Sequence, residues 1–94
     1  MYVAAFEVEI RIPDSHSLKD RRQVVRALLD GARHRFSVSA AEVGGQDTWQ
    51  LATLGFAVVA SEVRFAEEVV GSIDRFIWSH PGIEILEANV RWLD

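Results

Sequence analysis

The order in which two hydrophobic periods follow one another restricts the fold of this chain more than any other feature. Apolar side chains alternate at every second residue from Ala4 to Ile12, then within 49–61 and within 83–93, as in half-buried strands. A shorter strand-like segment, FSVSAAEV, occupies 36–43. Two other segments carry apolar residues at every third or fourth position, as on one face of a helix. The predicted order is strand, helix, strand, strand, helix, strand.

Both helical segments have recognisable end signals. Ser17 is predicted as the N-cap of the first helix, and Asp20 three residues later as its reciprocal partner in a capping box. Ser61 is predicted to cap the second helix. The turn His80-Pro81-Gly82 ends that helix, because proline lacks the backbone N–H that would continue it. The pair Gly44-Gly45 marks a turn between the two middle strands.

This order predicts one α+β domain over residues 1–94, a ferredoxin-like βαββαβ plait. Right-handed crossovers place four antiparallel strands in the order 4-1-3-2, with both helices on one face of the sheet. One core is expected between the sheet and the helices, made of Phe6, Val8, Ile10, Leu28, Leu29, Leu54, Phe56, Val58, Val70, Ile73, Phe76 and Ile77. The alternation in the last strand places Leu86, Ala88, Val90 and Trp92 on one side of that strand.

Composition excludes several classes of protein. The 94 residues carry a net charge of -4 and are 49% hydrophobic, which is typical of a globular chain and disfavours indiscriminate nucleic-acid binding. No cysteine is present, so the chain has neither a disulfide framework nor a thiolate metal site. The N-terminus lacks the pattern of a signal peptide, and no apolar run approaches the ~20 residues that cross a membrane. We expect a cytoplasmic protein.

The sequence contains no pattern that indicates catalysis, a metal or a cofactor. His16, His34 and His80 lack the converging spacing of zinc ligands. No glycine-rich phosphate loop precedes a helix, and Ser17 is better explained as a cap than as a nucleophile. We therefore expect a non-enzymatic protein.

Two glutamates on the first strand have a spacing that could suit an acid–base pair. Glu7 and Glu9 lie on one strand face, about 7 Å apart. No cleft is predicted beside them, and paired surface charges facing Arg11 or Arg91 across neighbouring strands are favoured.

Several short motifs resemble those of a known family. They are Ile12-Pro13, Ser17-Leu18-Lys19-Asp20-Arg21-Arg22, Phe36 to Val43, Gln46-Asp47-Thr48-Trp49-Gln50 and Ala52-Thr53-Leu54-Gly55. In these motifs the chain resembles the YlxP-like family of small bacterial proteins, a domain family of unknown function. The resemblance implies a ferredoxin-like fold and no accepted catalytic residues. Genes of the family often lie near genes for translation and ribosome-maturation factors, which implies a setting in translation.

A basic stripe on the first helix is the main functional candidate. Seven of the ten Lys and Arg residues lie between Arg11 and Arg35. Helical spacing puts four of them on one arc: Lys19, Arg22, Arg26 and Arg33. Three of these four lie in the N-terminal half, where the helix dipole disfavours cations, so helix stability does not account for them. The predicted binding set is completed by Arg21, Gln46, Asp47 and Trp49.

Two functional hypotheses follow from different features. In the first, an accessory factor touches structured RNA or a ribosomal subunit along the first helix, by shape and charge, because the open sheet lacks base-stacking aromatics. In the second, the protein is a homodimeric interaction module that binds no nucleic acid and uses the open sheet face of Val3, Ala5, Gly55, Ala57 and Val59. The stripe itself has a simpler explanation as a solvated face, with Arg21 or Arg26 paired to Asp30 or to other acids.

Overall fold

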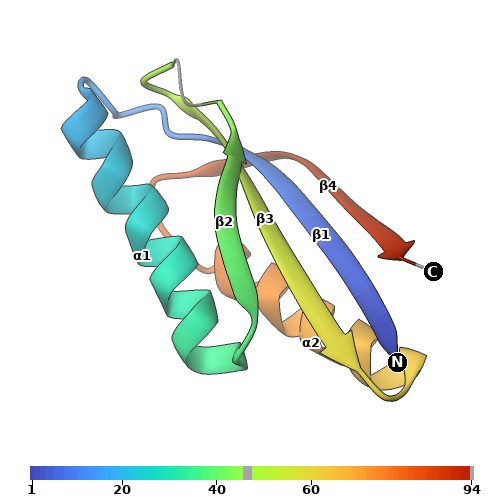
Figure 1. Cartoon of the computed structure of the whole chain (residues 1–94). Coiled ribbons are helices and arrows are strands. Elements are labelled where there is room, and N and C mark those ends of the chain that lie inside the picture. The colour runs from blue at the N-terminus through green and yellow to red at the C-terminus, as the bar shows by residue number, and fades with distance from the viewer. Residues whose placement is uncertain (46–47, 94) are drawn as a thin grey trace.

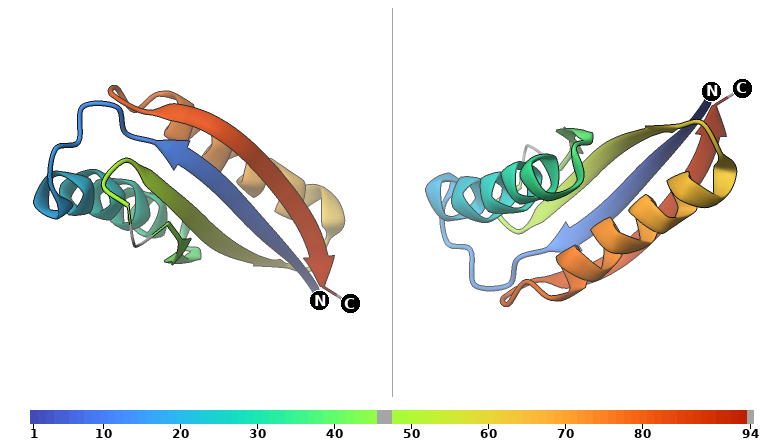
Figure 2. Two further views of the ribbon diagram at one scale, coloured as in Figure 1. Left: turned by 90° about the horizontal axis from the view of Figure 1, so that it is seen from above. Right: turned by 90° about the horizontal axis from the view of Figure 1, so that it is seen from below.

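The computed structural model describes residues 1–45 and 48–93 and contains the six predicted elements in the predicted order (Figure 1). Their bounds are β1 Tyr2–Arg11, α1 Leu18–Phe36, β2 Ser39–Gly44, β3 Leu51–Ala60, α2 Val63–Trp78 and β4 Glu84–Leu93. The strands are antiparallel and lie in the order β2-β3-β1-β4, which is the predicted 4-1-3-2 order counted from the other edge. The two helices lie on the same face of the sheet (Figure 2).

The core predicted from the hydrophobic periods is confirmed. Every predicted core residue is buried except Phe76, which packs half-buried against the others. The two helices meet where Gly31 of α1 faces Phe76 of α2, and a Cβ atom at Gly31 would lie 2.4 Å from the ring carbon Cζ. The glycine that weakens α1 as a helix therefore permits the close approach of α2.

The ends of the helices agree only in part with the sequence prediction. The N-cap of α1 is confirmed, since the backbone N–H of Asp20 donates to Oγ of Ser17 at 3.1 Å. The carboxylate of Asp20 accepts from the backbone N–H of His16, one residue before the cap. The prediction that Ser61 caps α2 is wrong: the N-cap is Glu62, which makes no capping hydrogen bond through its side chain. Ser61 stands one residue too early for that role.

A bulge changes the faces of β4. Glu9 of β1 pairs with Glu87, but the next residue of β1, Ile10, pairs with Ile85, so Leu86 is an extra residue in β4. Ile85 is consequently the residue that packs against the core, whereas Leu86 is 47% exposed. The predicted alternation from Leu86 onward was wrong at this position, because an unpaired residue reverses the pattern on its two sides.

Candidate nucleic-acid interface

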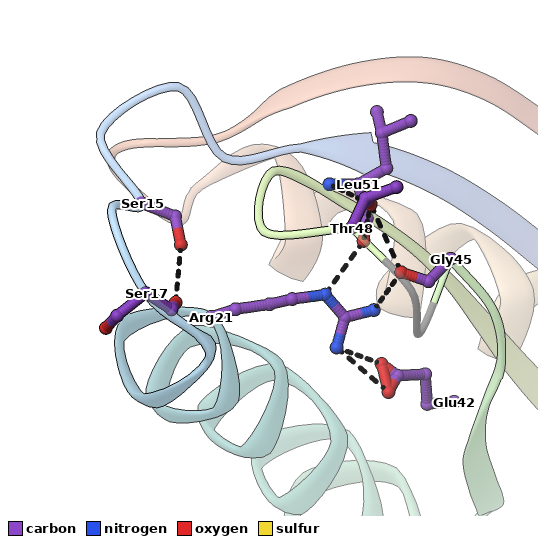
Figure 3. Close-up of polar contacts among 7 residues, drawn as sticks. All are labelled: Ser15, Ser17, Arg21, Glu42, Gly45, Thr48 and Leu51. Carbon is purple, nitrogen blue, oxygen red and sulfur yellow. Dashed lines mark hydrogen bonds and ion pairs between the residues drawn. The ribbon is translucent and has the colours of Figure 1, made fainter.

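Arg21 is buried, although the sequence placed it with the binding residues. It lies in the first turn of α1, and its side chain extends toward β2 and β3 (Figure 3). Its Nε donates to the carbonyl of Leu51 at 2.9 Å, and its Nη2 donates to the carbonyl of Gly45 at 2.8 Å. Its Nη1 lies 3.1 Å from Oε1 and 2.7 Å from Oε2 of Glu42, and the side chain is only 4% exposed.

These contacts make Arg21 a brace between α1 and the end of the β2–β3 hairpin. The guanidinium is shared among one carboxylate and two carbonyls of its own chain, so Arg21 supports the fold, and its contact with RNA or another partner stays a prediction. Its acidic partner, Glu42, could have been found in the sequence as the charged residue of an otherwise small and apolar strand. The two carbonyl acceptors belong to the backbone and leave no trace in the sequence.

Gly45 shapes the hairpin end that Arg21 binds. Its backbone has a φ of 79°, in the left-handed region that favours glycine. A Cβ atom at this position would lie 2.8 Å from the carbonyl oxygen of Leu51 and 2.9 Å from Cα of Ala52. The second glycine of the predicted turn is therefore needed for the two strand ends to approach each other beneath the guanidinium.

Arg33 is also tied within the chain. Its Nη1 lies 2.8 Å from Oδ1 of Asp30, and its Nη2 donates to the carbonyl of Ala40 in β2. The predicted pairing of Asp30 with a basic residue is therefore correct in kind, but the partner is Arg33 and not Arg21 or Arg26. With its charge matched by Asp30, Arg33 contributes little to the positive stripe.

Three cations of the predicted binding set stay exposed on α1. Lys19, Arg22 and Arg26 are exposed and form no ion pair with any residue that the structure describes. The term basic stripe refers below to these three residues and no longer includes Arg33. They extend over about 10 Å of the helix, about half of the roughly 21 Å from Lys19 to Arg33 that the four predicted residues would span.

A shallow hollow lies between α1 and β2 beside the basic stripe. It has a volume of about 250 Å³, and both Arg22 and Arg26 line it, with Val25 and Leu29 at its base. The two carboxylates at its rim, Asp30 and Glu42, are already paired with arginines of the same chain. An anionic group that entered the hollow would meet the exposed guanidinium groups of Arg22 and Arg26, which have no ion-pair partner among the described residues.

The predicted loop residues are only partly described. Gln46 and Asp47 lie outside the described residues. Trp49 is 57% exposed, in the connection between β2 and β3 at the same end of the molecule as the N-terminus of α1 (Figure 1). Next to it, Thr48 Oγ1 accepts from the backbone N–H of Leu51 at 3.1 Å, which holds the start of β3. The indole of Trp49 is thus largely exposed, and its contact with a partner stays a prediction.

The predicted open-face residues lie together on the two central strands. Val3 pairs with Val59, and Ala5 pairs with Ala57, across β1 and β3. The opposite neighbour of Val3 is Leu93 of β4, which is 54% exposed and was not anticipated as part of this face. Leu93 joins the open face because β4 pairs with β1 in this register, which only the folded chain shows.

Metal-ligand clusters and membrane-spanning helices are absent from the described residues. No group of three His, Asp or Glu side chains within 1–45 and 48–93 is placed to hold a metal ion. No helix in the described part of the chain is both long and apolar enough to span a membrane. Trp78, the last residue of α2, is 65% exposed.

Comparison with known proteins agrees with the resemblance noted in the sequence. Residues 3–90 match the family model described as "Protein of unknown function (DUF503)". The chain belongs to this family. One relative is the "Uncharacterized protein YlxP" of Bacillus subtilis (strain 168), which is 37% identical over 86 residues, covering 92% of this chain and 94% of the relative.

Solved structures similar to this family member share its fold. A de novo designed protein with a ferredoxin fold, determined by solution NMR, gives a TM-score of 0.58 at 16% identity, covering 97% of this chain and 86% of the design. Rv0793 from Mycobacterium tuberculosis gives a TM-score of 0.56 at 20% identity, covering 100% of this chain and 94% of the Rv0793 chain. At these identities the likeness shows the ferredoxin-like fold and nothing of activity.

Proposed function

We propose that the chain is a non-catalytic accessory protein that contacts structured RNA, such as that of a ribosomal subunit, through the basic stripe of α1. The observation that carries this proposal is the local excess of free positive charge. Lys19, Arg22 and Arg26 are exposed and without an ion-pair partner among the described residues, although the chain as a whole has a net charge of -4. Phosphate groups are the ligand that such a stripe attracts most strongly.

The rest of the molecule supports one docking orientation. Acidic residues outside the stripe repel a polyanion, so nucleic acid is held locally and does not coat the protein. The open sheet face carries Thr53, Gly55 and Ala57 on its central strand, where a base-stacking sheet would carry aromatics. We therefore expect recognition of backbone shape with little discrimination of sequence.

The test is a salt titration of binding to small-subunit ribosomal RNA, with a matched pair of charge reversals. The double variant Arg22→Glu, Arg26→Glu removes half or more of the proposed phosphate contacts. The control, Arg64→Glu with Arg75→Glu, makes the same change of charge on exposed positions of α2. The first variant is expected to abolish binding at about 50 mM salt, and the control to reduce it only slightly.

The salt dependence gives a second readout. Each phosphate contact contributes roughly 0.7–0.9 to the slope of log K against log salt concentration, so a single Arg22→Ala variant should lower the slope by a little under one unit. If the wild-type protein does not bind at about 50 mM salt, or if both double variants lose binding equally, the basic stripe is a solvated face and the proposal fails.

A further inference from the structure

β4 is an uncovered edge strand. All of its residues except Ile85 are exposed, including those that point toward the helix layer. The reason is the position of α2, which packs against β1 and β3 and leaves a groove beside β4. Val90 and Trp92 line this groove and are 43% and 41% exposed. Figure 1 shows β4 at the border of the sheet, with no described segment beyond it.

The two edges of the sheet differ in how they are protected. β2 has six residues and a bulge, and its Ala40 carbonyl accepts a hydrogen bond from Arg33. β4 has ten residues, and its sequence EILEANVRWL contains neither proline nor lysine, the residues that commonly block edge pairing. Beyond the bulge at Leu86 the strand is regular. A strand of this kind is a template for pairing with another strand.

The charges on β4 are mismatched within the chain. Glu87 lies directly opposite Glu9 of β1, and Glu7 lies opposite Asn89. Arg91 lies opposite Ala5, so the expectation that Arg91 faces a glutamate of β1 is wrong. Among the described residues, neither Glu87 nor Arg91 has an ion-pair partner. The carboxylate of Glu87 accepts from the side-chain amide of Asn89, but like charges directly opposite each other destabilise a sheet, so a cation from a partner would stabilise this edge.

We propose that β4 pairs antiparallel with β4 of a second copy of this chain, with Asn89 opposite Asn89 on the twofold axis. In that register Glu87 of each copy lies opposite Arg91 of the other, which gives two opposite-charge pairs on the open face. On the helix side, Ala88 of each copy lies opposite Val90 of the other. The mismatched acid and the free cation of β4 thus match each other across the dimer.

The register follows from the sequence of β4. Every second side chain of a strand lies on the same face. The pairing can therefore shift only by an even number of residues if the helix-side residues of the two copies are to lie opposite each other, and each such shift of two moves the twofold axis by one residue. Moving the axis to Ala88 places Glu87 opposite Asn89, and moving it to Val90 places Arg91 opposite Asn89. The axis at Asn89 is the one that pairs both Glu87 and Arg91 with opposite charges.

The proposed dimer has a continuous sheet of eight strands, with the α1 helices at its two far edges. It does not involve the basic stripe, so it stands or fails independently of the RNA contact. The regular pairing covers only a few residues of each strand, and the interface is smaller than that of a permanent dimer. A weak, concentration-dependent association is expected.

Charge reversal tests the register. Glu87→Arg or Arg91→Glu alone makes both pairs repulsive and should raise the dimer dissociation constant at least about tenfold in sedimentation equilibrium. The double variant Glu87→Arg, Arg91→Glu restores both pairs and should return the constant to within about threefold of wild type. Glu87→Arg also places a cation opposite Glu9, so the monomer should remain folded by circular dichroism. Val59→Arg, on the open face away from the edge, is the control and should leave the constant unchanged.

A disulfide test measures the same register directly. The chain has no cysteine, so Asn89→Cys introduces a single thiol. Opposed residues in antiparallel strands have Cα atoms about 4.5–5.5 Å apart, within the range that a disulfide spans. Diamide, which takes up the two thiol hydrogens, should convert this variant to a covalent dimer. Leu93→Cys is the control, because its two copies would stand about 26 Å apart along the strands and should not cross-link.

Any of four results would overturn the proposal. One is a monomer in sedimentation equilibrium up to about 500 μM. Another is equal cross-linking of the Asn89→Cys and Leu93→Cys variants. The third is a dimer dissociation constant of the double variant Glu87→Arg, Arg91→Glu that is no lower than those of the two single variants. The fourth is loss of the dimer in Val59→Arg while Glu87→Arg leaves the dissociation constant unchanged. This result would assign self-association to the open sheet face and not to the edge.

Discussion

At the scale of single residues, Arg21 shows how the fold uses a charge for its own support. Its guanidinium forms an ion pair with Glu42 and donates to two backbone carbonyls at the end of the hairpin. Removing it in Arg21→Ala leaves a largely buried carboxylate without its partner, and should lower the free energy of unfolding by about 2–4 kcal/mol. Urea unfolding followed by circular dichroism measures this. The neighbouring exposed Arg22, changed to alanine, should alter stability by no more than about 0.5 kcal/mol.

The geometry of the brace gives a further expectation for Arg21→Lys. Lysine keeps the charge but has one nitrogen, which cannot reach Glu42, Gly45 and Leu51 together as the planar guanidinium does. We expect this variant to lose about 1–3 kcal/mol, by leaving carbonyls unpaired. Wild-type stability in Arg21→Lys would show that charge alone holds the hairpin end.

At the scale of elements, the contact between α1 and α2 overrides helix propensity. Alanine favours a helix over glycine by about 1 kcal/mol, but in Gly31→Ala the new Cβ meets the ring of Phe76. The ring is confined by Phe36, at 6.0 Å between centroids, and by the guanidinium of Arg35 at 4.9 Å. We therefore expect Gly31→Ala to destabilise the protein by about 1–2 kcal/mol. In a Phe76→Leu background, which lacks the clashing ring carbon, the same change should become stabilising, and a double-mutant cycle in urea measures the difference.

The N-terminus of α1 allows a simpler test at the same scale. Ser17→Ala removes the acceptor for the backbone N–H of Asp20 and should cost about 1 kcal/mol in the free energy of unfolding. Ser61→Ala should have almost no effect, because Glu62 and not Ser61 is the N-cap of α2. Equal costs for the two serines would contradict the cap assignment.

At the scale of the whole molecule, stability depends on one core on one side of the sheet. Leu28 is fully buried in it, and Leu28→Ala should cost about 2–5 kcal/mol through the cavity that it leaves. For a domain of this size each kcal/mol lowers the melting temperature by about 4–8 °C, which calorimetry resolves. Trp78→Ala removes a larger side chain but one that is 65% exposed, so its melting temperature should change far less.

The sequence by itself determined the order of elements, the strand order, the core and the cap at Ser17. Each of these depends on spacing between residues close together in the chain, together with general rules for connecting strands. Phe6, Val8 and Ile10 show their burial by alternation, and Leu28 shows it by helical spacing. Helical spacing likewise predicts the positively charged face of α1, with Lys19, Arg22 and Arg26 exposed.

Only the tertiary structure decided which charges are free and which residues face one another across strands. Arg21 and Arg22 are adjacent in sequence, yet one binds the β2–β3 hairpin end and the other is exposed, because the direction of α1 relative to β2 separates them. Glu87 opposes Glu9, and past the bulge at Leu86 Ile85 opposes Ile10, in a pairing of strands almost eighty positions apart in the sequence. Such pairings follow from backbone hydrogen bonds between distant segments, which the side-chain pattern of either segment alone does not specify.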